Sequence, residues 1–261
     1  MSEEPVQTSR DGAVALIRLN RPRQLNVLDV ALGEAFLAAV QAVAADPTVR
    51  AVVLSGAGRS FMAGGDLSTF HADPDHAPAM AARLIDMFHA GIATMRSMAA
   101  PVIAAVQGPV AGGGLSLALA CDLIVAAEDT SFLSAYTKIG TSPDGGATWS
   151  LTRAIGARRA LEAMLLNDPI DARTALSMGL VNRVVPRDAL DDEALALARR
   201  IAAGASGATA AVKRLVHAAA TADLGDQLAA EKLSFVERAG TADFREGIAA
   251  FVERRPPRFE P

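Results

Sequence analysis

The chain has 261 residues and a formal net charge of −4, and it is 51% hydrophobic but only 4% aromatic. This length allows a large buried core, and the abundance of small apolar residues favours closely packed helices over an aromatic-rich β-sandwich. The basic residues are scattered, which argues against a nucleic-acid surface. The N-terminus does not resemble a signal peptide, and no apolar run approaches the ~18 residues of a membrane span. We therefore predict a cytoplasmic protein with no membrane partner.

Strands and helices alternate along the first three quarters of the chain. Short apolar runs bounded by turn residues predict strands at 13–20, 49–58, 101–108, 121–128 and 179–186. Apolar residues at helical spacing predict helices at 28–46, 80–99, 151–166 and 188–220, and a Gly-rich loop running into a helix at 110–120. This alternation implies an α/β fold with a mainly parallel sheet that is buried on both faces.

The C-terminal part of the chain has a different pattern. From about Gly204 the sequence predicts consecutive helices without strands. We therefore expect two parts, a βα core over residues 1–200 and a helical segment over residues 201–261. The apolar face of such a segment can pack on another subunit or on the core of its own chain.

Two segments rich in glycine are suited to expose backbone N–H groups. They are SFMAGGDL (60–67) and GPVAGGGLSLALACDL (108–123), and each follows a predicted strand and precedes a helix. At such positions backbone amides point outward and the helix dipole favours an anion. Together they can form an oxyanion hole, although close packing of strand and helix also requires glycine, and neither segment matches a nucleotide-binding motif.

The stretch KIGTSPDGGATW (138–149) contains Asp144 between a proline and two glycines. This composition favours a tight turn, and aspartate is also a good N-cap for the helix that follows. From these residues alone, Asp144 is a turn residue, a helix cap or an acid/base, and the turn is the plainest interpretation.

The cysteine and histidine residues do not predict a metal site. The single cysteine, Cys121, excludes an internal disulfide, and its apolar surroundings favour a small core residue. His71, His76, His89 and His217 show no metal-ligand spacing among themselves or with Cys121. We predict no metal.

Several separated motifs occur in an order that resembles the crotonase (enoyl-CoA hydratase/isomerase) superfamily. They are NRPRQLNVLD, GAGRSFMAGGDL, PVIAAVQGPVAGGGLSLALACDL, KIGTSPDGGATWSLTRAIGARRA and DARTALSMGLVNRVVP, and together they span nearly the whole chain. The resemblance implies a spiral of ββα units followed by C-terminal helices that form a trimer, often stacked into a dimer of trimers. It also implies an acyl-CoA thioester as substrate, with coenzyme A as part of the substrate and no further cofactor.

The resemblance assigns roles by motif position. The backbone amides of Gly65 and Gly113 would bind the thioester carbonyl, and each such donor can lower a barrier by about 3–4 kcal/mol. Arg23 would be a candidate phosphate contact, while Asp66 is more typical of a helix cap than of a catalyst. The residues expected to contact substrate are Arg23, Leu25, Ala63, Gly64, Asp66, Leu67, Gly112, Ser116, Tyr136 and Trp149.

Hydratases of this family hold the attacking water between two glutamates, and here those positions fall on Ser116 and Tyr136. Neither side chain replaces a carboxylate in moving a proton, so efficient hydration is not expected. SPDGGATW resembles instead the turn of epoxyphenylacetyl-CoA isomerases and Δ3,Δ2-enoyl-CoA isomerases, whose acid falls on Asp144. The resemblance therefore favours an isomerase with Asp144 as acid/base. Tyr136 and Trp149 would either shape the acyl pocket or serve as ordinary packing.

Three alternatives stay open on the sequence. One is a hydratase with atypical residues. Another is a hydrolase like 4-chlorobenzoyl-CoA dehalogenase, in which Asp144 attacks an aromatic ring and His89 assists the later hydrolysis. The third is a member that binds acyl-CoA with little turnover. The C-terminal sequence DFREGIAAFVERRPPRF resembles the hydratase/isomerase branch more than the dehalogenase.

Overall fold

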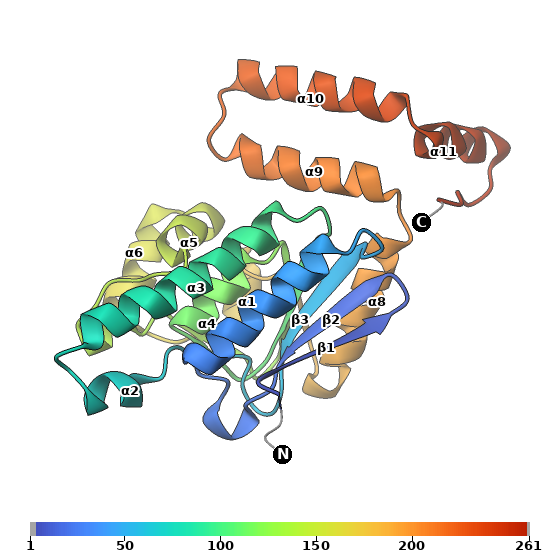
Figure 1. The fold of residues 1–261 in the computed structure, drawn as a ribbon. Helices are drawn as coiled ribbons and strands as arrows, with labels where there is room; N and C mark the ends of the chain where they lie inside the picture. The colour runs from blue at the N-terminus through green and yellow to red at the C-terminus, as the bar shows by residue number, and fades with distance from the viewer. Residues whose placement is uncertain (1–3, 260–261) are drawn as a thin grey trace.

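The computed structural model describes residues 4–259, which form a βα body with a separate group of helices at the C-terminus (Figure 1). The main sheet has six strands in the order β1-β2-β3-β4-β6-β9, and only the β1–β2 pair is antiparallel. These strands are β1 (Val6–Asp11), β2 (Val14–Leu19), β3 (Ala51–Gly56), β4 (Val102–Val106), β6 (Leu123–Ala127) and β9 (Arg183–Val185). The predicted α/β fold with a mainly parallel sheet is confirmed.

A second, three-stranded sheet gives the chain its spiral path. Its strands are β5 (Pro109–Ala111), β7 (Ser131–Leu133) and β8 (Ile170–Asp171), in the order β5-β7-β8. Both β4 and β6 of the main sheet are followed at once by a strand of the small sheet and then by a helical turn, so the chain winds through ββα units. The sequence did not predict this sheet, because strands of two or three residues carry too little periodicity to be recognised.

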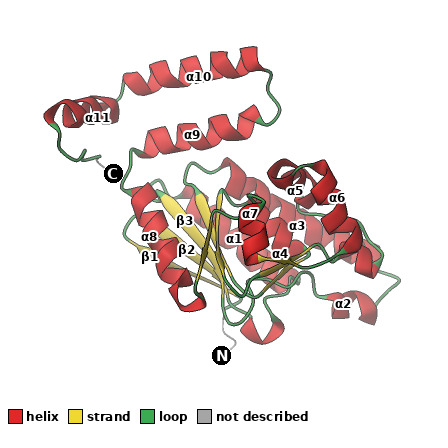
Figure 2. Cartoon of the chain, turned by 180° about the vertical axis from the view of Figure 1, so that it is seen from behind, coloured by secondary structure: helices red, strands yellow, loops and turns green. Residues whose placement is uncertain are grey.

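Helices cover both faces of the main sheet (Figures 1 and 2). Side chains alternate between two cores along each strand: Val52 and Leu54 of β3 join one apolar cluster, and Ala51 and Val53 join the other. The first cluster packs against α1 (Val30–Ala45), α3 (Ala77–Ser97) and α4 (Gly113–Ala120), and the second against α8 (Leu190–Ala202). The remaining helices are α2 (Leu67–Ala72), α5 (Ala147–Ile155), α6 (Ala157–Leu166), α7 (Ala172–Ser177), α9 (Ser206–Ala219), α10 (Leu224–Ala239) and α11 (Ala242–Glu253), with 3-10 helices η1 (Pro22–Gln24), η2 (Tyr136–Ile139) and η3 (Arg187–Ala189).

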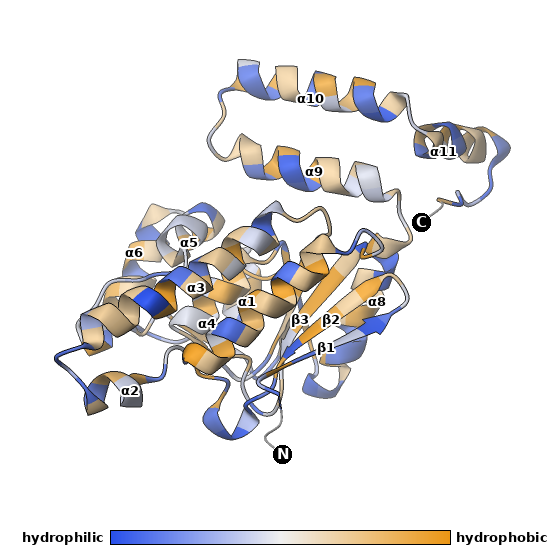
Figure 3. Ribbon diagram, in the orientation of Figure 1, coloured by the Kyte–Doolittle hydropathy of each residue, from blue (hydrophilic) through white to orange (hydrophobic). Residues whose placement is uncertain are grey.

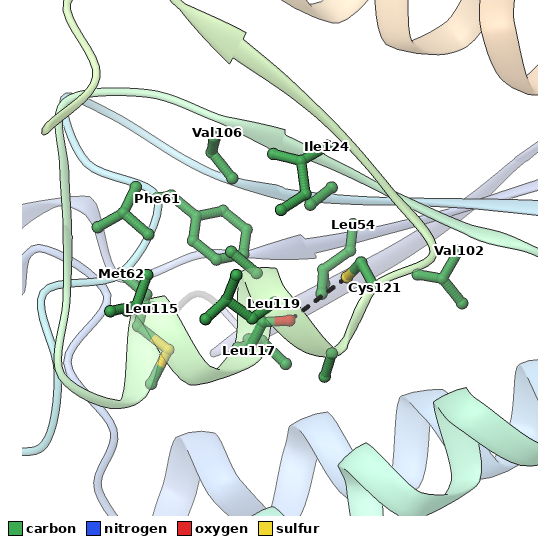
Figure 4. Close-up of a cluster of buried hydrophobic side chains, with 14 of the residues drawn as sticks. Leu54, Phe61, Met62, Val102, Val106, Leu115, Leu117, Leu119, Cys121 and Ile124 are labelled. Atoms are coloured by element: carbon green, nitrogen blue, oxygen red, sulfur yellow. Dashed lines mark hydrogen bonds between the residues drawn. The ribbon is translucent and has the colours of Figure 1, made fainter. Parts of the chain in front are cut away.

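Cys121 lies in the larger apolar cluster, at the end of α4 (Figure 4). Its Sγ donates to the carbonyl of Leu117 at 3.4 Å, and burial raises the pKa of the thiol. A buried thiol that stays protonated is a packing group and not a nucleophile, as its sequence surroundings predicted.

The predicted helix at 151–166 is two helices in the structure. α5 ends at Ile155 and α6 begins at Ala157, because Gly156 between them has a φ of +80° and turns the chain. Strand β1 was also not predicted: only Val6 is buried in it, so it lacks the apolar pattern of the other strands.

Helices α9, α10 and α11 extend beyond the body, where α9 and α10 lie side by side (Figures 1 and 2). The predicted boundary at residue 200 falls inside α8, which packs on the main sheet as far as Ala202. Polar and apolar segments alternate along α9 and α10 (Figure 3). Many large apolar side chains of this group are exposed: Val212, Val216, Leu224, Leu228, Leu233, Phe235, Val236, Ile248, Phe251 and Val252.

None of the helices within residues 4–259 combines the length and the apolar character that crossing a membrane requires.

Candidate active site

The two glycine-rich loops meet at Gly64 and Gly112. Both residues have positive φ angles, +103° and +52°. A Cβ atom on Gly112 would lie 3.5 Å from the Cα of Gly64, and one on Gly64 would lie 3.4 Å from the carbonyl oxygen of Ala111. These distances are ordinary contact, so it is the positive φ angles that a larger residue would strain and that favour glycine where the loops meet.

Among the backbone N–H groups of these loops that have no acceptor within residues 4–259 are those of Gly65 and Gly113. Leu28 bonds to the carbonyl of Gly64 at 2.8 Å and accepts from the N–H of Asp66 at 2.9 Å, so the N–H of Gly65 points away from that segment. Gly113 is the first residue of α4, where an N–H has no acceptor within its helix. Within residues 4–259 neither N–H donates a hydrogen bond, which leaves both available to an anionic oxygen.

Asn26 fixes the first loop, and sequence reasoning did not single it out. Its Nδ2 donates to the carbonyls of Ala57 at 3.0 Å, Ser60 at 2.9 Å and Phe61 at 3.0 Å, and the side chain is fully buried. The available sequence signal for this role of Asn26 was its polar side chain in the turn-rich segment RPRQLN. Asn26 therefore ties the segment of Arg23 to the loop of Gly65.

The residues expected along the coenzyme A channel lie on these two segments. Arg23 is exposed in η1, and the N–H of Ala63 donates to the carbonyl of Leu25 at 3.1 Å. Asp66 caps α2, accepting from the N–H of Ser68 at 3.0 Å, in agreement with the cap interpretation.

Beside this cap a groove of about 390 Å³ opens between α1, α2 and α3. Its walls are mainly apolar, with three charged side chains: Leu28, Asp29, Val30, Ala31, Asp66, Thr69, Phe70, Met80, Arg83 and Leu84 line it. Leu67, which was also expected in the channel, is exposed at the start of α2.

Asp144 lies next to α4, where it forms a hydrogen-bond network with Tyr136 and Ser116. The Tyr136 hydroxyl donates to Oδ1 of Asp144 at 2.6 Å and lies 3.0 Å from the Ser116 Oγ. Ser116 Oγ in turn donates to the main-chain oxygen of Asp144 at 2.9 Å. Because Ser116 follows Gly113 by one helical turn, the network places the Asp144 turn beside the free N–H groups.

The side chain of Asp144 does not cap a helix. Helix α5 begins at Ala147 after Gly146, which provides no side-chain cap, and only the main-chain oxygen of Asp144 accepts from the N–H of Ala147, at 3.1 Å. The turn itself is formed by backbone atoms, so the cap interpretation of the carboxylate is wrong.

Tyr136 is held in place by its own 3-10 helix, η2. Ala135 before it has a φ of +64°, which is uncommon for a residue other than glycine. Thr137 after it bonds to the carbonyl of Met164 at 3.2 Å and to the side chain of Asn167. Burial, and then the carboxylate of Asp144, raise the pKa of Tyr136, so its hydroxyl keeps its proton and remains a donor.

Helix α3 supports the same site from the other side. Nε2 of His89 accepts from the N–H of Gly145 at 2.9 Å. The ring of Phe88 would meet a Cβ on Gly113 at 3.8 Å and one on Gly145 at 2.8 Å. These two side chains of α3 therefore connect the loop of Gly113 to the turn of Asp144.

The indole of Trp149 packs against two arginine side chains. The guanidinium carbons of Arg153 and Arg96 lie 3.9 Å and 4.7 Å from the centre of its ring. Arg96 follows His89 by seven residues, or about 10 Å along α3. Cation–π packing at the far end of α3 thus occupies the indole, in line with the packing role left open on the sequence.

Comparison with known proteins identifies the family. The sequence profile described as enoyl-CoA hydratase/isomerase matches residues 9–261. A probable enoyl-CoA hydratase of Rhodobacter capsulatus is 38% identical over 99% of both chains, and the 1,2-epoxyphenylacetyl-CoA isomerase of Escherichia coli is 35% identical over 94% of both. The crystal structure of an enoyl-CoA hydratase from Polaromonas sp. JS666 superposes with a TM-score of 0.94, at 37% identity, over 98% of this chain and 99% of that one. The protein is therefore a crotonase-fold member of the enoyl-CoA hydratase/isomerase family.

Proposed function

We propose that this member of the family is an isomerase that moves a double bond in an enoyl-CoA, or opens a strained ring as in epoxyphenylacetyl-CoA, with Asp144 as its acid/base. One observation carries the proposal. Asp144 supplies the carboxylate of the site, while Ser116 and Tyr136, at the positions of the hydratase glutamates, lie 3.0 Å apart and are hydrogen-bonded to each other. Two hydroxyls in direct contact provide neither the space nor the basicity to activate a water between them.

The catalytic cycle needs one titrating group. The N–H groups of Gly65 and Gly113 would bind the thioester oxygen and stabilise the enolate charge. Asp144 takes a proton from C2, and the electron pair of the C2–H bond enters the dienolate. The same carboxyl group then returns the proton at C4, and the electrons restore the carbonyl with the double bond between C2 and C3. In a ring-opening substrate the enolate would instead expel a neighbouring oxygen.

Substrate binding would use the segments on both sides of the oxyanion hole. Coenzyme A would lie along residues 23–28 and 63–67, with the exposed guanidinium of Arg23 near its phosphates. The apolar groove next to Asp66 is part of the same region.

A hydratase with atypical residues is the second candidate, because relatives such as the Rhodobacter capsulatus protein are described as probable enoyl-CoA hydratases. A 3-enoyl-CoA and crotonyl-CoA, assayed separately for conjugation and hydration, distinguish the two. The isomerase proposal requires a rapid double-bond shift, slow hydration, and loss of the shift in Asp144→Asn. Rapid hydration of crotonyl-CoA that Asp144→Asn leaves unchanged would overturn it.

We further propose that α9–α11 form the contacts of a homotrimer or a dimer of trimers. The exposed apolar side chains there, among them Phe235 and Phe251, would cost free energy in water. Sedimentation equilibrium should give a mass of three or six chains. Phe251→Glu should lower it, whereas a native mass of one chain would contradict the proposal.

A further inference from the structure

The two oxygens of the Asp144 carboxylate have different surroundings. Oδ1 accepts from the Tyr136 hydroxyl at 2.6 Å, whereas Oδ2 has no hydrogen-bond partner among residues 4–259. Tyr136 is 8% exposed, and its position is fixed by η2 and by the buried Ser116. Asp144 is only partly buried. Oδ1 is therefore bound to Tyr136, while Oδ2 is open to a ligand.

The hydroxyl protons explain why this arrangement is stable. Tyr136 has one proton to donate, and a carboxylate is the strongest acceptor within its reach. The phenolic oxygen can still accept the single proton of Ser116 Oγ, for which the main-chain oxygen of Asp144 at 2.9 Å is the other acceptor. Ser116 thus lies against both the Tyr136 hydroxyl and the backbone of Asp144 while Tyr136 holds Oδ1.

We propose that Tyr136 is a positioning residue that reserves Oδ2 of Asp144 for proton transfer. The inference rests on the proposed isomerase function. A carboxylate that can rotate presents either oxygen to the substrate and exchanges its proton with solvent between the two steps. With Oδ1 bound, the proton leaves C2 for Oδ2, forms an O–H bond there, and moves from Oδ2 to C4 over one face of the dienolate.

The test follows a hydrogen label as well as the rate. With a 3-enoyl-CoA deuterated at C2, the wild type should deliver a large fraction of the label to C4. Tyr136→Phe should lower that fraction by at least about half and lower kcat about 10–100-fold, the effect of losing a hydrogen bond to a charged group, with KM changed less than about 3-fold. Lys138→Gln, exposed on the same 3-10 helix, should match the wild type in both measurements.

A spectroscopic test uses the fact that Tyr136 is the only tyrosine of the chain. Growth on 3-fluorotyrosine labels this position alone and keeps its hydroxyl, so label transfer to C4 should be retained. The fluorine resonance should shift when Asp144→Asn is introduced, because the charged acceptor is removed. This measurement does not depend on whether Tyr136→Phe folds.

The outcomes separate the two proposals. If Asp144→Asn keeps the double-bond shift, the proposed function is wrong. If Asp144→Asn abolishes the shift but folded Tyr136→Phe transfers label like the wild type, Tyr136 is not a positioning residue. A fluorine resonance unmoved by Asp144→Asn would likewise overturn the inference.

Discussion

The N–H of Gly145 donates a hydrogen bond to Nε2 of His89 at 2.9 Å. A ring nitrogen that accepts must be unprotonated, so the proton of the neutral imidazole is on Nδ1. A hydrolytic base needs its lone pair free for water, and here that lone pair is bound to the residue next to Asp144. His89 in this arrangement holds the turn that contains Asp144, which counts against its role as a base in a dehalogenase-like reaction.

Replacement of His89 tests this role. His89→Ala leaves the N–H of Gly145 without its acceptor and should lower kcat for the double-bond shift about 10-fold. His89→Gln offers an amide oxygen close to the position of Nε2 and should recover most of the loss. If the glutamine variant were as impaired as the alanine variant, the imidazole would have a chemical role that an acceptor cannot replace.

Proline at position 113 would remove the N–H group. Gly113 is the first residue of α4, the helix position at which proline is favoured. A Cβ added at this position would meet Met62 and Phe88 at 3.7–3.8 Å, which is ordinary contact, and the proline Cδ would take the place of the N–H hydrogen. Gly113→Pro should therefore fold and lower kcat/KM about 10²–10³-fold, the effect of one oxyanion donor.

Gly113→Ala is the matched control, because it adds the same Cβ and keeps the N–H. It should retain most of the activity and the melting temperature of the wild type. Equal losses in the two variants would show that the added volume, not the missing donor, is responsible.

Much of this site could be predicted from the sequence because local patterns determine it. The strand–loop–helix order indicates that backbone N–H groups of the two glycine-rich loops can point outward, and the family resemblance then selects those of Gly65 and Gly113. The cap formed by Asp66 depends on its immediate neighbours alone. The roles assigned to these residues stay predictions until activity is measured.

The family resemblance placed Ser116, Tyr136 and His89 near Asp144, but their hydrogen bonds to its turn could not be predicted from local patterns, because they come from three distant elements. Tyr136 is in η2, Ser116 in α4 and His89 in α3, and no spacing along the chain indicates that they converge. The same limit applies to Asn26, whose three carbonyl acceptors lie 31–35 residues away. Side-chain contacts over such separations depend on tertiary packing and not on periodicity.

The C-terminal helices are anchored to the body by a buried charge. Lys213 of α9 lies 2.9 Å from Asp122 and donates to the carbonyls of Met95 at 2.8 Å and Ala100 at 3.1 Å. Its side chain is 5% exposed, so removing it leaves a carboxylate and two carbonyls short of a partner. Lys213→Met should lower the free energy of unfolding by about 3–5 kcal/mol.

Two comparisons test the reason for that loss. Lys138→Met, at an exposed position of η2 outside the C-terminal helices, should change the free energy of unfolding by less than about 0.5 kcal/mol. Adding Asp122→Asn to Lys213→Met should restore part of the stability, because the carboxylate that lost its lysine, and keeps only His217 and the N–H of Val102, is then neutral. If denaturant unfolding gave additive losses in the double variant, the two groups would not be coupled.

The only tyrosine of the chain also gives an alkaline signature. Burial and the Asp144 carboxylate raise the pKa of Tyr136 above its ordinary value of 10.0, so the unfolded chain loses this proton before the folded one does. The contribution of the neutral phenol to stability is therefore complete below pH 10 and declines as the pH rises beyond it. Tyr136→Phe lacks this titration, so the difference in unfolding free energy between the wild type and this variant should shrink only above about pH 10.

Tyrosinate absorbance gives a second test of the raised pKa of Tyr136. In the native protein it should be small at the pH where free tyrosine is half ionised. Asp144→Asn should increase it, because one of the two causes of the raised pKa is removed. If Tyr136 in the native protein titrated like free tyrosine, its hydroxyl would not be buried against Asp144. The proposal that Tyr136 positions the Asp144 carboxylate would then be wrong.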